Sequence, residues 1–144
     1  MKFLLFFSLF LTSTVYATDI SGIWKQIDDK TGSSKAMIRI TKDQNNIYTG
    51  TILKITPRSG YTPQPICVKC PAPYTNQPIL GLDLIHHLKE TQSGVYEGGQ
   101  ILDPLTGKMY NLKGKVSANN KQLQLRGYIG TSALGRTQVW LKED

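Results

Sequence analysis

Beyond the first twenty residues, apolar and polar positions alternate along much of the chain. Ala36, Ile38 and Ile40 are separated by single residues, and the same spacing recurs in 109–116 and 122–130. A period of two is what a strand requires when one face is buried and the other meets solvent. The pattern therefore predicts β-strands.

Eight such runs follow one another at the regular spacing typical of a sandwich or barrel. Glycines inside several runs mark the bulges and bends by which a sheet curls and closes. We therefore predict an all-β fold, a single small antiparallel up-and-down barrel. The run 79–88 also fits a short helix, because periodicity does not decide so short an apolar stretch. The predicted strands are 22–28, 35–42, 47–56, 79–88, 94–103, 108–117, 122–130 and 136–142.

Polar turn residues join these strands. Segments 28–32 and 103–107 each begin with an aspartate and end with a glycine, which is typical of a type I turn closed by a residue in the left-handed conformation. In an up-and-down barrel, the connections after the first, third, fifth and seventh strands share one end. They are the longer and more polar ones, so we expect the functional site there.

Segment 57–78 interrupts the alternation and predicts a long ordered loop, since it holds six of the seven prolines and both cysteines. The Cys67-x-x-Cys70 spacing admits a disulfide, a thiol–disulfide redox centre or half of a metal site. We favour the disulfide. Prolines directly after Cys70 leave little room for the helix that a redox pair uses, and zinc needs two further ligands.

The chain begins with Lys2, an apolar run over 3–11 and then small and polar residues as far as Ala17. This order is typical of a secretory signal peptide, and the run is too short to span a bilayer. We expect cleavage after Ala17. Residues 1–17 are then the signal peptide, and 18–144 form one exported domain in the periplasm or outside the cell.

The formal net charge is +7, which permits binding to anionic polymers of the cell envelope. The lysines are scattered singly, however, and no block of like charge forms a nucleic-acid tail. Neither nucleic acid nor a membrane span is expected.

Several short motifs, spread over nearly the whole chain after residue 22, resemble the bacterial domain of unknown function 2147 family. The resemblance implies a small exported bacterial protein with a lipocalin-like (calycin) barrel. The motifs include Gly22-Ile23-Trp24-Lys25, Cys67-x-x-Cys70, Gly98-Gly99-x-Ile101-Leu102-Asp103-Pro104, Arg126-Gly127-Tyr128-Ile129-Gly130 and Gly135-Arg136-Thr137-Gln138-x-Trp140.

Gly22-x-Trp24 is similar to the lipocalin entry signature, in which the tryptophan plugs the closed end of the barrel. A basic residue from the end of the last strand packs over that tryptophan in the family. Here Arg136 begins the last predicted strand, at the opposite end from Trp24, and only Lys142 has roughly the required position. The signature is therefore half matched.

An arginine near a barrel mouth can bind a carboxylate or phosphate through two parallel hydrogen bonds. For Arg136 the alternative is an ion pair with Asp103 or Asp28 at the same rim. Arg126 alternates onto the polar face and is expected to point outward. Aromatic residues are expected in the core or wall first and as ligand contacts second. The candidate ligand-binding residues are Arg136, Tyr128, Tyr110 and Trp140.

The chain shows no catalytic constellation. His86 and His87 are adjacent, so they point to opposite faces of a strand, and no acidic partner lies nearby in the sequence. The aspartates of 28–32 and 103–107 are explained by their turns, and no serine has a nucleophile elbow. Neither an enzyme nor a cofactor is expected.

Two classes of function remain. The first is a binding module that holds a small apolar or amphipathic ligand inside the barrel. The second is a surface-interaction protein whose basic exterior docks on an anionic envelope component or a partner protein. A thiol–disulfide or metal role of Cys67 and Cys70 is a third alternative. The volume inside the barrel separates the first two, since barrels of eight strands are either filled or hollow.

Overall fold

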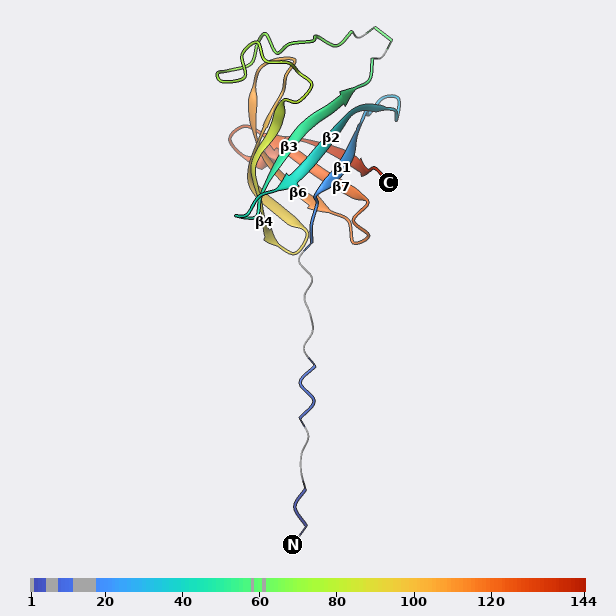
Figure 1. The fold of residues 1–144 in the computed structure, drawn as a ribbon, viewed down its shortest axis with the longest axis vertical. Coiled ribbons are helices and arrows are strands. Elements are labelled where there is room, and N and C mark those ends of the chain that lie inside the picture. The colour runs from blue at the N-terminus through green and yellow to red at the C-terminus, as the bar shows by residue number, and fades with distance from the viewer. Residues whose placement is uncertain (1, 5–7, 12–17, 58, 61) are drawn as a thin grey trace.

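The computed structural model describes residues 2–4, 8–11, 18–57, 59–60 and 62–144. Eight antiparallel strands form a closed barrel in which each strand pairs with the next and the last pairs with the first (Figure 1). A single 3₁₀ turn, η1 (Ser132–Leu134), precedes the last strand. The strands are β1 (Gly22–Ile27), β2 (Ser34–Lys42), β3 (Ile47–Ile55), β4 (Asp83–Gln92), β5 (Val95–Leu102), β6 (Met109–Val116), β7 (Gln122–Tyr128) and β8 (Arg136–Lys142).

The all-β up-and-down barrel expected from the sequence is confirmed, and seven strands begin and end within two residues of their predicted bounds. The prediction for the fourth strand is wrong at both ends, because β4 covers Asp83–Gln92 instead of 79–88. Residues 79–82 form a turn, in which the Leu82 amide donates to the Ile79 carbonyl and the Gly81 amide donates to Ile52 of β3. Ile79 and Leu82 are buried in this turn, so their apolar character reflects packing of the loop and not a strand.

The sheet closes because its strands bend at bulges. Gly98 has a φ of +71°, and the register between β5 and β6 shifts between Tyr96 and Gly99. A positive φ carries no steric penalty for glycine, and bulges of this kind increase the local bend of a strand. The bulge at Gly98 therefore confirms the prediction that glycines inside strands mark bends of the sheet.

One end of the barrel is closed by the residues just before β1. Ile20 is fully buried there beside Trp24, whose indole Nε1 donates to the Ile20 carbonyl over 2.9 Å. The Lys142 ammonium lies 4.7 Å from the centre of the Trp24 ring and donates to the Ser21 carbonyl over 2.7 Å. A cation over an indole face is attractive. Lys142 thus covers the tryptophan from the end of the last strand.

Tyr48 and Tyr96 also seal this end, with their rings 5.4 Å apart in an edge-to-face arrangement. The Tyr96 hydroxyl donates to the Thr18 carbonyl, and the Tyr48 hydroxyl donates to Asp19. Burial, followed by the charges of Asp19 and Glu90, raises the pKa of Tyr48 to about 12. These polar atoms are satisfied by the segment that closes the barrel.

The loop between β3 and β4 lies over the opposite end and is held to the rim (Figure 1). Cys67 and Cys70 form a disulfide with Cα atoms 5.4 Å apart, as the sequence analysis favoured. The disulfide-bonded turn packs on the β5–β6 connection, where a Cβ on Gly107 would collide with the Lys69 carbonyl. Gly107 also has a φ of +75°. Only glycine suits both requirements, so the loop and this turn form one rim.

The described residues that precede Thr18 lie away from the barrel in Figure 1. Phe3, Leu4, Leu9, Phe10 and Leu11 are each at least 75% exposed. The predicted cleavage site after Ala17 lies outside the described residues. None of the helical structure described in this chain has the length and apolar character of a segment that crosses a bilayer.

Candidate functional site

A cavity of about 510 Å³ occupies the barrel at the end opposite Trp24. Its mouth is formed by the connections after β1, β5 and β7, which contribute Asp29, Asp103, Pro104, Leu105 and Leu134. The structure therefore brings the polar connections together around an opening, as the up-and-down topology predicted.

The wall of the cavity is mainly aliphatic. Its side chains come from each strand from β2 to β7, because inward positions of successive strands converge in a closed barrel. Such a wall favours an apolar group, whose contact area leaves water on binding. The apolar lining includes Ala36, Ile38, Ile52, Ile101, Leu102, Leu112 and Leu125.

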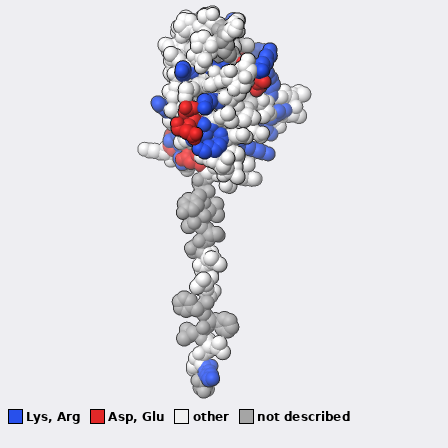
Figure 2. All heavy atoms as spheres, turned by 90° about the vertical axis from the view of Figure 1, so that its right-hand side faces the viewer, with Lys and Arg blue, Asp and Glu red and all other residues white. Residues whose placement is uncertain are grey.

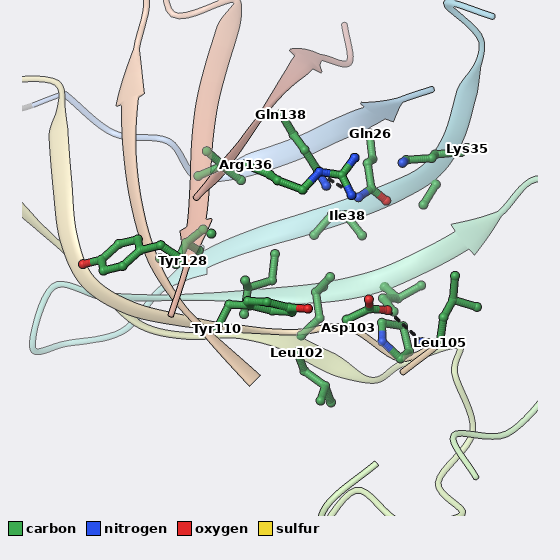
Figure 3. Close-up of a pocket in the computed structure, with 18 of the residues that line it drawn as sticks. Gln26, Lys35, Ile38, Leu102, Asp103, Leu105, Tyr110, Tyr128, Arg136 and Gln138 are labelled. Carbon is green, nitrogen blue, oxygen red and sulfur yellow. Dashed lines mark hydrogen bonds between the residues drawn. The ribbon is translucent and has the colours of Figure 1, made fainter. Parts of the chain in front are cut away.

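Two basic side chains, Arg136 and Lys35, line the cavity near its mouth (Figure 3). Within the described part of the chain, neither forms a hydrogen bond or an ion pair. The alternative of an Arg136–Asp103 salt bridge is thus not formed here. Asp103 instead accepts a hydrogen bond from the Leu105 amide within its own turn. Among the described residues, no acidic side chain occupies the guanidinium of Arg136.

Four side chains alternate along the inward face of β8, from the mouth to the closed end. They are Arg136, Gln138, Trp140 and Lys142. The Gln138 Oε1 atom accepts hydrogen bonds from Trp140 Nε1 (3.2 Å) and from Gln26 Nε2 on β1 (2.9 Å). This column connects the cationic mouth to the buried floor of the barrel.

The four candidate ligand-binding residues occupy different places. Tyr110, Tyr128 and Arg136 all line the cavity. In Figure 3 the Tyr110 ring lies across the cavity from Arg136, whereas the Tyr128 hydroxyl points away from both. Trp140 is fully buried and does not line the cavity. It contacts the site through its hydrogen bond to Gln138.

Arg126 points outward, as alternation predicted, and does not line this cavity. It has a different role, because its guanidinium holds the β7–β8 connection. Nε donates to the Ser132 carbonyl over 2.6 Å, Nη2 donates to the Ala133 carbonyl, and Nη1 donates to Thr137. That connection carries Leu134, which lines the mouth. Arg126 therefore positions part of the rim from outside.

The aspartates and histidines considered as catalytic candidates take part in turns and ring packing. Asp28 accepts hydrogen bonds from the Lys30 and Thr31 amides of its turn. His86 lies against the Tyr74 ring at 5.3 Å, and His87 is exposed at a bulge with a φ of +59°. Among the described residues, no group of three or more His, Cys, Asp or Glu side chains could hold a metal ion.

Sequence reasoning missed three polar residues of the cavity, namely Gln26, Lys35 and Gln138. A signal for two of them was present. Gln26 follows Trp24 by two residues, and Gln138 precedes Trp140 by two, so each glutamine shares the face of a tryptophan. A polar residue on the inward face of a barrel strand indicates that the packed core ends there and a pocket begins.

The comparisons with known proteins agree with this architecture. A family model described as "Uncharacterized protein conserved in bacteria (DUF2147)" matches residues 22–142. None of the curated proteins matches the chain.

A solved structure described as "Protein HP1028 from the human pathogen Helicobacter pylori belongs to the lipocalin family" is similar, with a TM-score of 0.73. The two chains are 17% identical, and the likeness covers 89% of this chain and 85% of that chain. At this identity the likeness concerns the fold alone. The chain therefore belongs to the DUF2147 family of bacterial proteins, and its closed eight-stranded barrel is lipocalin-like.

Proposed function

We propose that the protein is a non-enzymatic binding module for a small amphipathic ligand. The apolar tail enters the barrel, and an acidic head group meets Arg136 at the mouth. The observation that carries this proposal is the cavity of about 510 Å³, in which an arginine without an ion-pair partner among the described residues lies beside an aliphatic wall. Ligand pockets are commonly about 300–1,000 Å³, mostly apolar, with a few polar groups that fix orientation.

The test is binding of dodecanoic acid to the purified barrel, with the affinity measured by calorimetry. Wild-type protein binds, and Arg136→Ala weakens binding about ten- to a hundred-fold, because a two-point charged contact is lost. Arg39, exposed on β2 and outside the cavity, provides the matched control. Arg39→Ala leaves the affinity unchanged. If Arg136→Ala and Arg39→Ala behave alike, Arg136 does not hold the head group.

Arg126→Ala should weaken binding less than Arg136→Ala. Arg126 does not reach the cavity, and it acts only through the connection that it holds. Arg126→Ala should loosen the β7–β8 connection, which would be measured as faster amide hydrogen exchange in residues 131–135.

A second candidate is docking of the outer surface on an anionic envelope polymer. Lys113 and Arg126 face one another across β6 and β7 and share an outer groove with Lys115. Like charges directly opposite are unfavourable, and an anion would relieve them. Elsewhere the basic side chains are spread over the barrel and some lie beside acids (Figure 2), as in the Lys25–Glu143 pair. Salt-dependent binding of polysaccharide, with no amphiphile bound, would favour this candidate.

The sequence of the first seventeen residues supports a site of action outside the cytoplasm. We propose that the signal peptide is cleaved after Ala17 and that the barrel works in the periplasm or outside the cell. The disulfide supports this, since disulfides persist in oxidising compartments. The intact mass of protein from those fractions should correspond to a chain that begins at Thr18. Full-length protein confined to the cytosol would contradict export.

A further inference from the structure

We propose that the ligand carries a hydrogen-bonding group, a hydroxyl or an amide, between its acidic head and its apolar tail. Gln26 and Gln138 recognise this group. The inference rests on the proposed function and makes the ligand class more specific. It predicts a hydroxylated fatty acid or an N-acylated amino acid in preference to a plain fatty acid.

The orientation of both glutamine amides is determined by Trp140. An indole N–H donates and never accepts, so the Gln138 atom that lies 3.2 Å from Trp140 Nε1 must be the carbonyl oxygen. The same oxygen lies 2.9 Å from the Gln26 side chain, which must therefore offer its amide nitrogen. The buried tryptophan thus removes the ambiguity that an amide side chain otherwise has.

Two polar groups remain once these bonds are made. The Gln138 Nε2 amide keeps its N–H donors, and the Gln26 Oε1 atom keeps its acceptor capacity. Neither has a hydrogen-bond partner among the described residues. Neither is sealed inside the protein, and both side chains line the cavity (Figure 3). The wall therefore presents a donor and an acceptor to whatever enters.

An all-apolar tail would be a poor occupant at this depth. It would displace water from Gln138 Nε2 and Gln26 Oε1 without replacing their hydrogen bonds, which costs free energy. A hydroxyl or amide both donates and accepts, so it can satisfy both glutamines. Sites of this kind discriminate against analogues that lack the matching polar group.

The position along β8 places this group next to the head. Arg136 and Gln138 are alternate residues on one strand face, so their Cα atoms are separated by roughly 7 Å. Aliphatic side chains lie beside the glutamines in the same cavity. Leu125 pairs in register with Gln138, and Ile38 and Leu112 also line the cavity. An occupant that matches this lining has an acid, a donor and acceptor close to the acid, and an apolar chain.

The experiment compares three probes of similar tail length by calorimetry. They are dodecanoic acid, 3-hydroxydodecanoic acid and N-dodecanoylglycine. Wild-type protein should bind at least one of the two polar derivatives about three- to tenfold more tightly than dodecanoic acid, the effect of one neutral hydrogen bond. Which derivative gains more identifies a hydroxyl or an amide as the recognised group.

Gln26→Met tests the assignment, because it removes the acceptor and keeps the Gln138–Trp140 bond. The ratio of the affinity for each polar derivative to the affinity for dodecanoic acid should fall toward one. Trp140→Phe, which frees the Gln138 amide to turn over, should also reduce the preference. Thermal unfolding of each variant shows that it is folded.

The outcomes separate the two proposals. Equal affinity of wild type for all three probes overturns the glutamine subsite and leaves the binding module standing. Binding of none of them overturns both. A preference that survives unchanged in Gln26→Met and in Trp140→Phe shows that other residues recognise the polar group and overturns the assignment.

Discussion

The two ends of the barrel differ in how their polar atoms are satisfied. At the closed end, the Trp24 indole, the Tyr96 hydroxyl and the Lys142 ammonium all donate to backbone carbonyls of residues 18–21. At the open end, Arg136 has no partner in the described part of the chain, and Gln138 uses only its oxygen.

We infer from this difference that the closed end stabilises the fold and that the open end is the place for recognition of a ligand. The closed end is a plug in which these three side chains are paired with the backbone, as buried polar groups generally are in folded proteins. Under the proposed function, water satisfies the polar groups of the open end until a ligand replaces it. Changes at the closed end should therefore lower the free energy of unfolding, whereas changes at the mouth should alter binding.

The largest expected effect is at the plug. Trp24→Ala should lower the free energy of unfolding by about 3–5 kcal/mol, because it leaves a cavity where a fully buried indole packs. Denaturant titration followed by fluorescence or circular dichroism measures the loss. Trp24→Phe, which keeps most of the packing, is the milder control. If Trp24→Ala unfolded like wild type but lost ligand binding, the distinction between the two ends would be wrong.

The disulfide at the open rim should matter less. The double change Cys67→Ser and Cys70→Ser should lower the free energy of unfolding by less than about 3 kcal/mol, since the bridge closes a very short loop. The barrel should stay folded. Because the bridged turn packs on Gly107, hydrogen exchange should rise in residues 103–108. Two titratable thiols in the oxidised wild type, or stoichiometric zinc, would contradict a structural role.

A smaller effect is expected from the cation over Trp24. Lys142→Met should cost about 1 kcal/mol, from the loss of the contact with the ring and the hydrogen bond to Ser21. Burial lowers the pKa of the Lys142 ammonium, with Asp19 opposing this effect, so desolvation offsets part of the gain. Lys121→Met is the matched control. Its ion pair with Asp144 is exposed and should contribute close to nothing.

Alkaline pH should weaken the closed end selectively. The pKa of Tyr48 is raised to about 12 in the folded chain, above its ordinary value of 10.0. A raised pKa means that the protonated phenol contributes stability fully below pH 10 and loses it as the pH rises toward 12. Between pH 8 and pH 11, the free energy of unfolding should fall less for Tyr48→Phe than for wild type. An equal loss in both would assign the alkaline weakness to other groups, such as Tyr96, whose pKa is also raised.

Much of the fold could be predicted because strand alternation and turn chemistry are local. The runs around Ile38 and Leu125 and the glycine-closed turns at 28–32 and 103–107 were sufficient for the barrel. The error at 79–88 has a physical cause. Ile79 and Leu82 are apolar because a folded loop buries them, and local pattern does not distinguish burial in a loop from burial in a strand.

The candidate site could be predicted only in part. Alternation and topology placed Arg136 at the mouth and Arg126 outside, and both side chains lie there. Lys142 had only roughly the position of the basic residue that covers the tryptophan in lipocalins, and the structure places its ammonium over the Trp24 ring. The sequence did not predict that Arg126 holds the β7–β8 connection. Its partners are carbonyls of residues whose path depends on the closed barrel.

The sequence by itself determined the class of fold and the end of the barrel where the polar connections gather, and it favoured a disulfide between two nearby cysteines. These depend on residues close together in the chain. Only the tertiary structure decided that the barrel has an open cavity and that Gln26, Gln138 and Trp140 share hydrogen bonds. Cavity volume depends on how inward side chains of all eight strands pack together. The glutamine pair exists because β1 and β8, 112 residues apart at Gln26 and Gln138, close the barrel side by side.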